Sequence, residues 1–338
     1  MKLYAGIDLH STNSFVGIVA HDGTRVFGKR IENNRHKIQL ILDRFKSDLD
    51  SIVVESTYNW YWLVDMLQEN GYKVHLANPA GNIQYGGLKY TNDESDAYWL
   101  GDLKRLGILK EGYIYPKEFR PTRDLLRRRL MFVRQRTAQI LSLQSLLTRQ
   151  FSLKLPGETI KRMEVDFFDD MTMAPDYLAL AKHNVQTIQY LNQVTKSIET
   201  SILGKVKPKP EFVLLTTIPG IGPILGLTIM LEVGDINRFS KIGEYSSYCR
   251  SVTSKRTSNG KKKGKGNKKN GNRYLAWAYI EAANFSKRYC PEIQRYYQRK
   301  KAKSGNVIAL KALSNKLARA SYQIMRHQEP FDVKKLFG

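Results

Sequence analysis

Four acidic residues in the first hundred positions have the types and the spacing of a metal-binding site. Asp8 and Glu55 each follow an apolar run that is typical of a buried strand, and Asp93 and Asp96 lie three residues apart where a helix is expected to begin. Side chains at strand ends point out of the edge of a sheet, and residues three apart on a helix share a face. We therefore expect the four carboxylates to meet in space.

A cluster of four carboxylates repels itself unless cations neutralise it. Hard divalent cations prefer oxygen ligands, so the sequence predicts a site for Mg²⁺, or for Mn²⁺ in its place. The chain as a whole is strongly basic, with 55 Lys and Arg against 31 Asp and Glu and a net charge of +24. Such a charge indicates a polyanionic partner, most often nucleic acid. Metal-binding acids in a basic chain predict phosphodiester chemistry.

At 338 residues, the chain is long enough for two or three domains. Its two cysteines, Cys249 and Cys290, form neither a disulfide framework nor a metal-ligand spacing, so we expect reduced thiols in a cytoplasmic protein. The sequence has no signal-peptide pattern and no apolar run long enough to span a bilayer, so no membrane partner is expected.

The first block, residues 1 to about 115, alternates apolar runs with helical patterns, which predicts an α/β domain. Turn residues between Leu9 and Phe15 indicate a hairpin, and Gly71 is a helix C-cap signal. The expected strands cover residues 3–8, 15–19, a stretch ending near Arg30, 51–55 and 72–76, and the expected helices cover 35–46, 60–70 and a region from about 93.

The second block, from about Pro121 to Gly204, is helical and rich in arginine. Apolar residues at helical spacing form a stripe, and two long helices that face each other predict an antiparallel coiled-coil arm. Arg127, Arg128 and Arg134 are candidate contacts to nucleic acid, because almost no acid lies among the arginines. The alternative is that they form a solvated helix face. The arginines of this segment are Arg120, Arg123, Arg127, Arg128, Arg129, Arg134 and Arg136.

A linker rich in Lys and Pro, residues 205–210, separates the arm from a third block. Its turn at 219–223 precedes an apolar helix expected over 224–233 and resembles the hairpin of helix-hairpin-helix modules. Gly220 and Gly222 would let backbone N–H groups approach a phosphate at the helix N-terminus. A turn with a purely structural role is the alternative.

Residues 255–273 contain no acid and almost no apolar side chain, so we expect a flexible loop that orders on a phosphate backbone. A hydroxyl flanked by cations, that of Ser258, could attack a phosphodiester whose charge those cations screen. A serine in a basic loop is more often only a polar residue. The candidate phosphate contacts here are Lys255, Arg256, Lys261, Lys262, Lys263, Lys265 and Arg273.

The order of these motifs resembles that of the DEDD insertion-sequence transposases, which include the Piv-type DNA invertases and the bridge-RNA-guided recombinases. The resemblance covers nearly the whole chain. It implies an RNase H-like (RuvC-like) α/β domain at 1–115, a helical coiled-coil arm at 116–208 and a mainly α-helical transposase domain at 209–338. The matching motifs are Gly6-Ile7-Asp8-Leu9-His10, Glu55-Ser56-Thr57, Asp93-Glu94-Ser95-Asp96-Ala97, Ile218-Pro219-Gly220-Ile221-Gly222, Thr257-Ser258-Asn259-Gly260-Lys261 and Gly271-Asn272-Arg273-Tyr274-Leu275.

By motif match, the resemblance implies that Asp8, Glu55, Asp93 and Asp96 bind Mg²⁺ and that Ser258 forms a covalent link to DNA. It also implies donor and target DNA, a structured guide (bridge) RNA and a dimer or tetramer in the bacterial cytoplasm at the nucleoid. Relatives often have Ser-Ser-Gly-Gly where this chain has the segment 257–260, Thr-Ser-Asn-Gly. Ser258, which directly precedes the Asn-Gly turn, is the expected nucleophile.

Three other classes stay open at this point. A RuvC-like, structure-specific endonuclease would use the same acids with water as nucleophile, although it would have no need of the basic Ser-Asn-Gly loop. An actin-like kinase or chaperone ATPase would fit the Gly-Ile-Asp-Leu segment at 6–9, but no later Asp-x-Gly-Gly motif follows. A basic nucleic-acid-binding protein without catalysis would use the acids only to cap helices or pair with arginines.

Overall fold

The computed structural model describes residues 1–79, 81–82, 92–205, 209–253, 255–265 and 270–337. The chain divides into two units, Met1–Lys117 and Glu118–Gly338, and each is described by itself. Within the described ranges, no helix combines the length and the apolarity needed to cross a bilayer. Residues 206–208 of the linker expected at 205–210 lie outside the described residues.

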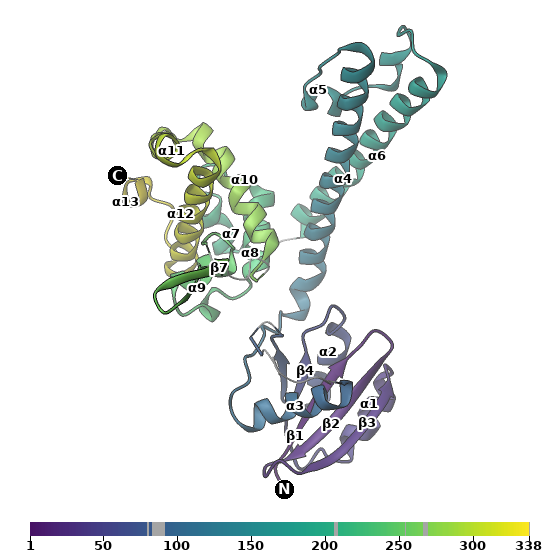
Figure 1. Cartoon of the computed structure of the whole chain (residues 1–338), viewed down its shortest axis with the longest axis vertical. Helices are drawn as coiled ribbons and strands as arrows, with labels where there is room; N and C mark the ends of the chain where they lie inside the picture. The colour runs from purple at the N-terminus through teal and green to yellow at the C-terminus, as the bar shows by residue number, and fades with distance from the viewer. Residues whose placement is uncertain (80, 83–91, 206–208, 254, 266–269, 338) are drawn as a thin grey trace. The chain divides into compact units, whose positions relative to one another are not determined.

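A five-stranded sheet in the order β3-β2-β1-β4-β5 forms the first unit (Figure 1). The pairs β1–β2 and β2–β3 are antiparallel, whereas β1–β4 and β4–β5 are parallel. This mixed sheet confirms the predicted α/β class and fits a RuvC-like domain. Its elements are β1 (Leu3–Leu9), β2 (Asn13–Ala20), β3 (Arg25–Glu32), α1 (Arg35–Asp43), β4 (Leu49–Glu55), α2 (Tyr61–Glu69), β5 (Val74–Ala77) and α3 (Asp93–Arg105).

The boundaries agree with the sequence patterns to within a few residues. β1 and β2 form the expected hairpin, and the largest difference is at α1, which ends at Asp43 rather than near Lys46. Gly71 has φ +79°, as a left-handed helix C-cap requires. Ile38 and Leu42 of α1 and Leu63 of α2 are fully buried in the core that these helices form with the sheet.

A row of glycines lets α3 lie unusually close to the sheet. Gly6, Gly17 and Gly28 are paired in register across β1, β2 and β3. A Cβ atom at Gly6 would lie 1.9 Å from the Ala97 carbonyl oxygen of α3, and one at Gly28 would lie 2.1 Å from the Tyr98 hydroxyl. Only a surface without side chains along this row accommodates the helix, because a methyl group at Gly6 would overlap backbone.

Two long helices, α4 and α6, pack against each other in the second unit (Figure 1). Arg129 of α4 contacts Glu199 of α6, and Arg136 contacts Asn192, so the two helices run in opposite directions, as expected for the arm. The elements of this part are η1 (Lys117–Phe119), α4 (Arg120–Phe151), α5 (Gly157–Lys161), η2 (Val165–Phe168) and α6 (Pro175–Lys205).

The remaining helices surround α8, whose residues from Leu225 to Val233 are all buried. This core also contains Leu126 and Ile202, so the base of each arm helix is part of it. The helix predicted over 224–233 is confirmed. The elements are α7 (Pro210–Leu215), α8 (Pro223–Val233), η3 (Ile236–Arg238), α9 (Ile242–Tyr248), β6 (Lys255–Ser258), β7 (Lys261–Lys265), α10 (Arg273–Tyr289), α11 (Pro291–Ser304), α12 (Asn306–His327) and α13 (Val333–Phe337).

The basic segment expected to be a flexible loop contains a β-hairpin, and that expectation is corrected here. β6 pairs antiparallel with β7, and Ser258 is paired with Lys261. Asn259 and Gly260, the two turn residues, have φ +49° and +69°, which matches a type I′ turn. An Asn-Gly pair favours this turn strongly enough to form a hairpin without an apolar core.

We predict that Gly6→Ala will destabilise the protein by about 1–3 kcal/mol, the usual cost of overpacking, because α3 must move away from β1. The same displacement should move the acids at the start of α3 and abolish DNA cleavage. Urea unfolding and a cleavage assay measure the two effects. Gly112→Ala is the matched control, because its nearest contacts are at an ordinary 3.5 Å. Wild-type stability in Gly6→Ala would contradict the argument.

Candidate active site

The sheet register places Asp8 beside Glu55. Gly6 of β1 is paired with Val53 of β4, and two residues further along each strand come Asp8 and Glu55. Side chains two apart on a strand share a face, so both acids lie on the face that α3 covers, where Gly6 and Val53 contact it. Asp8 is only 4% exposed, and Glu55 is half-buried at the end of β4.

The N-terminus of α3 supplies the other two acids. Asn92 caps the helix: its side chain accepts a hydrogen bond from the Ser95 backbone N–H, and its own N–H donates to the Ser95 hydroxyl. This capping box fixes where the helix begins. Asp93 and Asp96 therefore fall in its first turn, where the helix dipole favours negative charge. The position predicted for the helix start is confirmed.

The pKa values of Asp8 and Asp96 are raised in part by the neighbouring acids. The pKa of Asp8 is raised to about 7, first by burial, then by its hydrogen bond with the Glu55 side chain, while the nearby His10 opposes the shift. Burial and the negative charges of Glu55 and Asp93 raise the pKa of Asp96 as well. The structure thus groups the ligand atoms of Asp8 and Asp93 with His10, and Glu55 and Asp96 interact electrostatically with this group.

Two basic side chains beside the acids, those of His10 and Arg30, were not among the predicted site residues. His10 lies between two of them, with Nδ1 3.5 Å from an Asp8 oxygen and Nε2 3.6 Å from an Asp93 oxygen. Arg30 of β3 forms an ion pair with Asp93 at 2.6 Å. The sequence signal for His10 is that it follows Asp8 by two residues, since side chains two apart in an extended chain share a face. Arg30 is in register with Phe15, which is paired with Asp8.

The donor atoms of this cluster fit a divalent cation. One ligand atom from each of Asp8, His10 and Asp93 lies within 4.8 Å of the others. Carboxylate oxygens suit Mg²⁺ and Mn²⁺, and an imidazole nitrogen is a ligand of transition metals such as Mn²⁺. A cation at this point would also relieve the mutual repulsion that raises the pKa of Asp8 and Asp96.

Most arginines of the arm have partners within the second unit. Arg120 and Arg123 are buried, Arg129 contacts Glu199, and Arg136 donates to Asn192. Only Arg128 and Arg134 of the seven are exposed, so these two keep the predicted role of nucleic-acid contact. Arg127, the third candidate, also has a partner inside the protein, described next, and its contact with nucleic acid stays a prediction.

Arg127 pairs with a buried acid instead. Its Nε and Nη2 lie 2.6 and 2.7 Å from the two carboxylate oxygens of Glu232, which is 3% exposed. The Asn272 side chain donates to the same carboxylate at 2.7 Å, and the guanidinium lies 4.6 Å from the Tyr274 ring. Arg127 thus joins the base of the arm to α8 and to the start of α10.

Gly220 also has a structural reason to be glycine. It has φ +90°, and a Cβ there would lie 2.4 Å from the Ser286 backbone nitrogen of α10. The Ser286 hydroxyl donates to the Pro219 carbonyl at 2.5 Å. The turn is therefore packed against α10 at Gly220, and the phosphate contact at this glycine stays a prediction. Gly222, the N-cap of α8, is exposed with nothing near its Cβ direction.

Ser258 lies at the end of β6 and is exposed, in the second unit, whereas the acids lie in the first. Lys261, Lys263 and Arg273 are exposed as well. Arg273 donates to the Tyr274 hydroxyl at 2.9 Å. Lys255 and Arg256 lie in β6, and Lys262 and Lys265 lie in β7.

Hydrogen bonds close the chain segment that carries this hairpin. The Arg250 guanidinium donates twice to the Gly271 carbonyl, at 3.0 and 2.8 Å, and the Asn272 backbone N–H donates to the Tyr248 carbonyl at 2.6 Å. Gly271 has φ +88°, and a Cβ there would lie 2.5 Å from the Tyr248 oxygen. The Gly-Asn pair therefore ties the end of the hairpin segment to its beginning.

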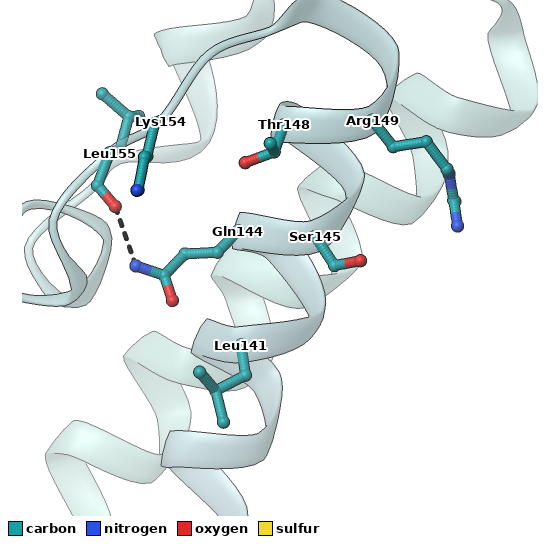
Figure 2. Close-up of a pocket in the computed structure, with 7 residues that line it drawn as sticks. All are labelled: Leu141, Gln144, Ser145, Thr148, Arg149, Lys154 and Leu155. Carbon is teal, nitrogen blue, oxygen red and sulfur yellow. Dashed lines mark hydrogen bonds between the residues drawn. The ribbon is translucent and has the colours of Figure 1, made fainter.

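A pocket near the far end of α4 is separate from these residues (Figure 2). Gln144, Arg149 and Lys154 are among the residues that line it, and Gln144 donates to the Leu155 carbonyl at 2.8 Å. None of the predicted site residues lines this pocket.

Acids gathered at the ends of two strands and at the start of the helix that covers them fit a DEDD-type transposase domain. A family model for the IS110 DEDD enzymes, described as Transposase, matches residues 5–152, and another, described as Transposase IS116/IS110/IS902 family, matches residues 213–298. These matches support an IS110-family transposase, which acts on DNA and whose type suggests divalent-metal use. No curated protein matches the chain.

Asp8→Asn should stabilise the chelator-treated protein at pH 8, on the order of 2 kcal/mol, while abolishing DNA cleavage and sparing DNA binding. A folded-state pKa near 7, above the ordinary 3.8, means that the folded protein binds the extra proton. Wild-type stability should therefore fall as the pH rises from about 4 to 7. Thermal unfolding across this range should show the slope in wild type and its loss in Asp8→Asn. The same pH dependence of stability in Asp8→Asn as in wild type would contradict this prediction.

The variants Arg127→Ala and Arg128→Ala should distinguish an arginine with a structural role from one that contacts DNA. Arg127→Ala leaves the buried Glu232 uncompensated and should cost about 3–5 kcal/mol in the free energy of unfolding. Arg128→Ala should leave stability unchanged, but should lower the slope of log affinity against log salt by about 0.9. Urea unfolding and DNA binding at several salt concentrations measure both. A lower salt slope in Arg127→Ala with unchanged stability would instead support a DNA contact by Arg127.

Proposed function

We propose that this protein is an insertion-sequence transposase that cleaves and exchanges DNA strands through a covalent serine–DNA intermediate. The grouping of Asp8 with Asp93 and His10, with Glu55 bonded to Asp8 and with Glu55 and Asp93 raising the pKa of Asp96, carries the proposal. In it, residues 1–115 form the metal-binding domain, 116–208 the arm and 209–338 the domain with the nucleophile.

Asp8, Glu55, Asp93 and Asp96 hold Mg²⁺ in this proposal, with Mn²⁺ as a substitute. The bound cation supplies charge stabilisation to the scissile phosphate and to the leaving oxygen. His10 contributes a nitrogen next to Asp8 and Asp93 and orients both carboxylates. Arg30 holds Asp93 toward the cluster from the neighbouring part of the sheet.

Ser258 is the nucleophile. Its Oγ attacks phosphorus in line, the bond from phosphorus to the 3′ oxygen breaks, and the serine proton ends on the released 3′-hydroxyl. A 3′-hydroxyl from another strand then attacks the phosphoserine ester, re-forms a phosphodiester and returns the proton to Ser258. Each step exchanges one ester for another, so strand exchange needs no ATP.

Several features support Ser258 in this role. It is exposed, it directly precedes a tight turn, and Lys261 is paired with it across the hairpin. The bonds of Arg250 and Asn272 hold the two ends of this segment together. Positioned groups react faster than free ones, because orientation is established before the chemical step.

The family resemblance adds partners to this proposal. We infer that donor and target DNA are joined by a structured guide RNA, and that the protein acts as a dimer or tetramer in which Ser258 serves the acids of its own or a neighbouring subunit. RNA that copurifies with the protein and maps beside its gene would support the guide. Copurified RNA of random cellular origin would argue against it.

A nicked suicide substrate should trap a protein–DNA adduct that survives denaturation and maps to the peptide containing Ser258. Ser258→Ala should lose the adduct entirely, because alanine has no oxygen to attack, and should still bind DNA through the surrounding cations. Mass spectrometry of the digested adduct identifies the attachment site.

Thr257→Ala is the matched control, since it removes the neighbouring hydroxyl and should keep the adduct. An adduct that persists in Ser258→Ala but disappears in Thr257→Ala would move the nucleophile by one residue. Hydrolytic cleavage without an adduct in any variant would instead favour a RuvC-like endonuclease that uses water.

A further inference from the structure

The exposed face of α11 has the composition of a nucleic-acid contact. α11 packs on α10 and α12 through Ile293 and Tyr297, which are buried, and the Tyr296 ring contacts Phe337 of α13 edge to face. The opposite side is open to solvent. Its exposed residues include Gln294, Arg295, Gln298, Arg299, Lys301 and Lys303.

Every polar residue on this exposed face can donate a hydrogen bond to a phosphate oxygen. Arg, Lys, Gln and Tyr side chains are common phosphate contacts in protein–DNA complexes. Arg295, Arg299 and Lys303 follow one another at intervals of four, about 6 Å apart along the helix axis. Tyr289, at the end of α10 and 69% exposed, extends the face beyond the start of α11.

The charge of α11 is almost uncompensated. Five of its fourteen residues are Lys or Arg, and its acid is Glu292. Glu292 lies 3.3 Å from Arg295 and also accepts a hydrogen bond from the Cys290 thiol. The cations on this exposed side repel one another, and an incoming polyanion would relieve that repulsion.

We propose that the exposed face of α11, from Arg295 to Lys303, binds the phosphate backbone of duplex DNA without reading its sequence. Charge complementarity argues for a polyanion, and the two family matches argue for DNA. The predicted contacts of this chain lie on α4, the 219–223 turn and the 255–273 segment, so α11 is an additional surface. The proposal does not depend on the role of Ser258.

α10 sets the distance between this face and the hairpin. The helix begins at Arg273, directly after the Gly-Asn pair that closes the hairpin segment, and ends at Tyr289. Its 17 residues span about 25 Å. The two surfaces together would hold one duplex at two points.

The test is the salt dependence of DNA binding by the full-length triple variant Arg295→Gln, Arg299→Gln, Lys303→Gln. Loss of three phosphate contacts should lower the slope of log affinity against log salt by about 2.7 on a long duplex and weaken binding about tenfold or more. The three side chains are exposed, so thermal unfolding should match wild type. The triple variant Arg35→Gln, Arg44→Gln, Lys46→Gln, with the same loss of charge at exposed positions of the first unit, should keep the wild-type slope.

An unchanged slope in the α11 variant would overturn the proposal, as would an equal decrease in both triple variants, which would mean that only net charge matters. A decrease seen with single-stranded RNA but not with duplex DNA would also overturn it and identify RNA as the partner. A decrease with duplex DNA that is specific to the α11 variant supports the proposal, even if Ser258→Ala still forms an adduct.

Discussion

The close approach of α3 to the sheet is the constraint on which the acid cluster depends. Gly6, Gly17 and Gly28 leave a track without side chains across three strands, and the next residues on the same face carry Asp8 and Arg30. Because the helix rests in this track, its first turn reaches the acids of β1 and β4. An ordinary helix–sheet distance, set by apolar side chains, would hold Asp93 and Asp96 several ångströms farther away. The glycines therefore have no chemical role, yet they decide whether the site exists.

A single buried carboxylate has a comparable importance in the second unit. Glu232 receives Arg127 from the arm and Asn272 from the N-cap of α10. An uncompensated charge at this depth is very unfavourable, so the three groups must stay together. Asn272 in turn closes the segment that carries the β6–β7 hairpin. Glu232 therefore holds the base of the arm and the cap of α10 to the same point of α8.

The local patterns of the sequence predicted much of the fold, and tertiary contacts explain part of what they missed. The strands followed from apolar runs and the start of α3 from the helical pattern near Asp93, because those signals are local. The partner of Arg127 could not be predicted, since Glu232 is 105 residues away and looks like part of an apolar helix. The glycine of the 219–223 turn matched a phosphate-binding pattern, but its packing against Ser286 is a tertiary contact. The high charge of the 255–265 segment predicts a flexible loop, whereas its Asn-Gly turn favours the hairpin that forms there.

The first unit holds its acids in an arrangement that is unfavourable without a cation, and the rest of the domain must stabilise it. The apolar core under the sheet and the capped helix fix the backbone, so the carboxylates cannot separate to relieve their repulsion. Protonation of Asp8, the ion pair of Arg30 and the contacts of His10 offset part of that repulsion. A divalent cation would offset more, because it brings two charges to the point where the acids converge. A site that is prepared in this way loses little free energy to reorganisation when the cation binds, which is what electrostatic stabilisation of a phosphoryl transition state requires.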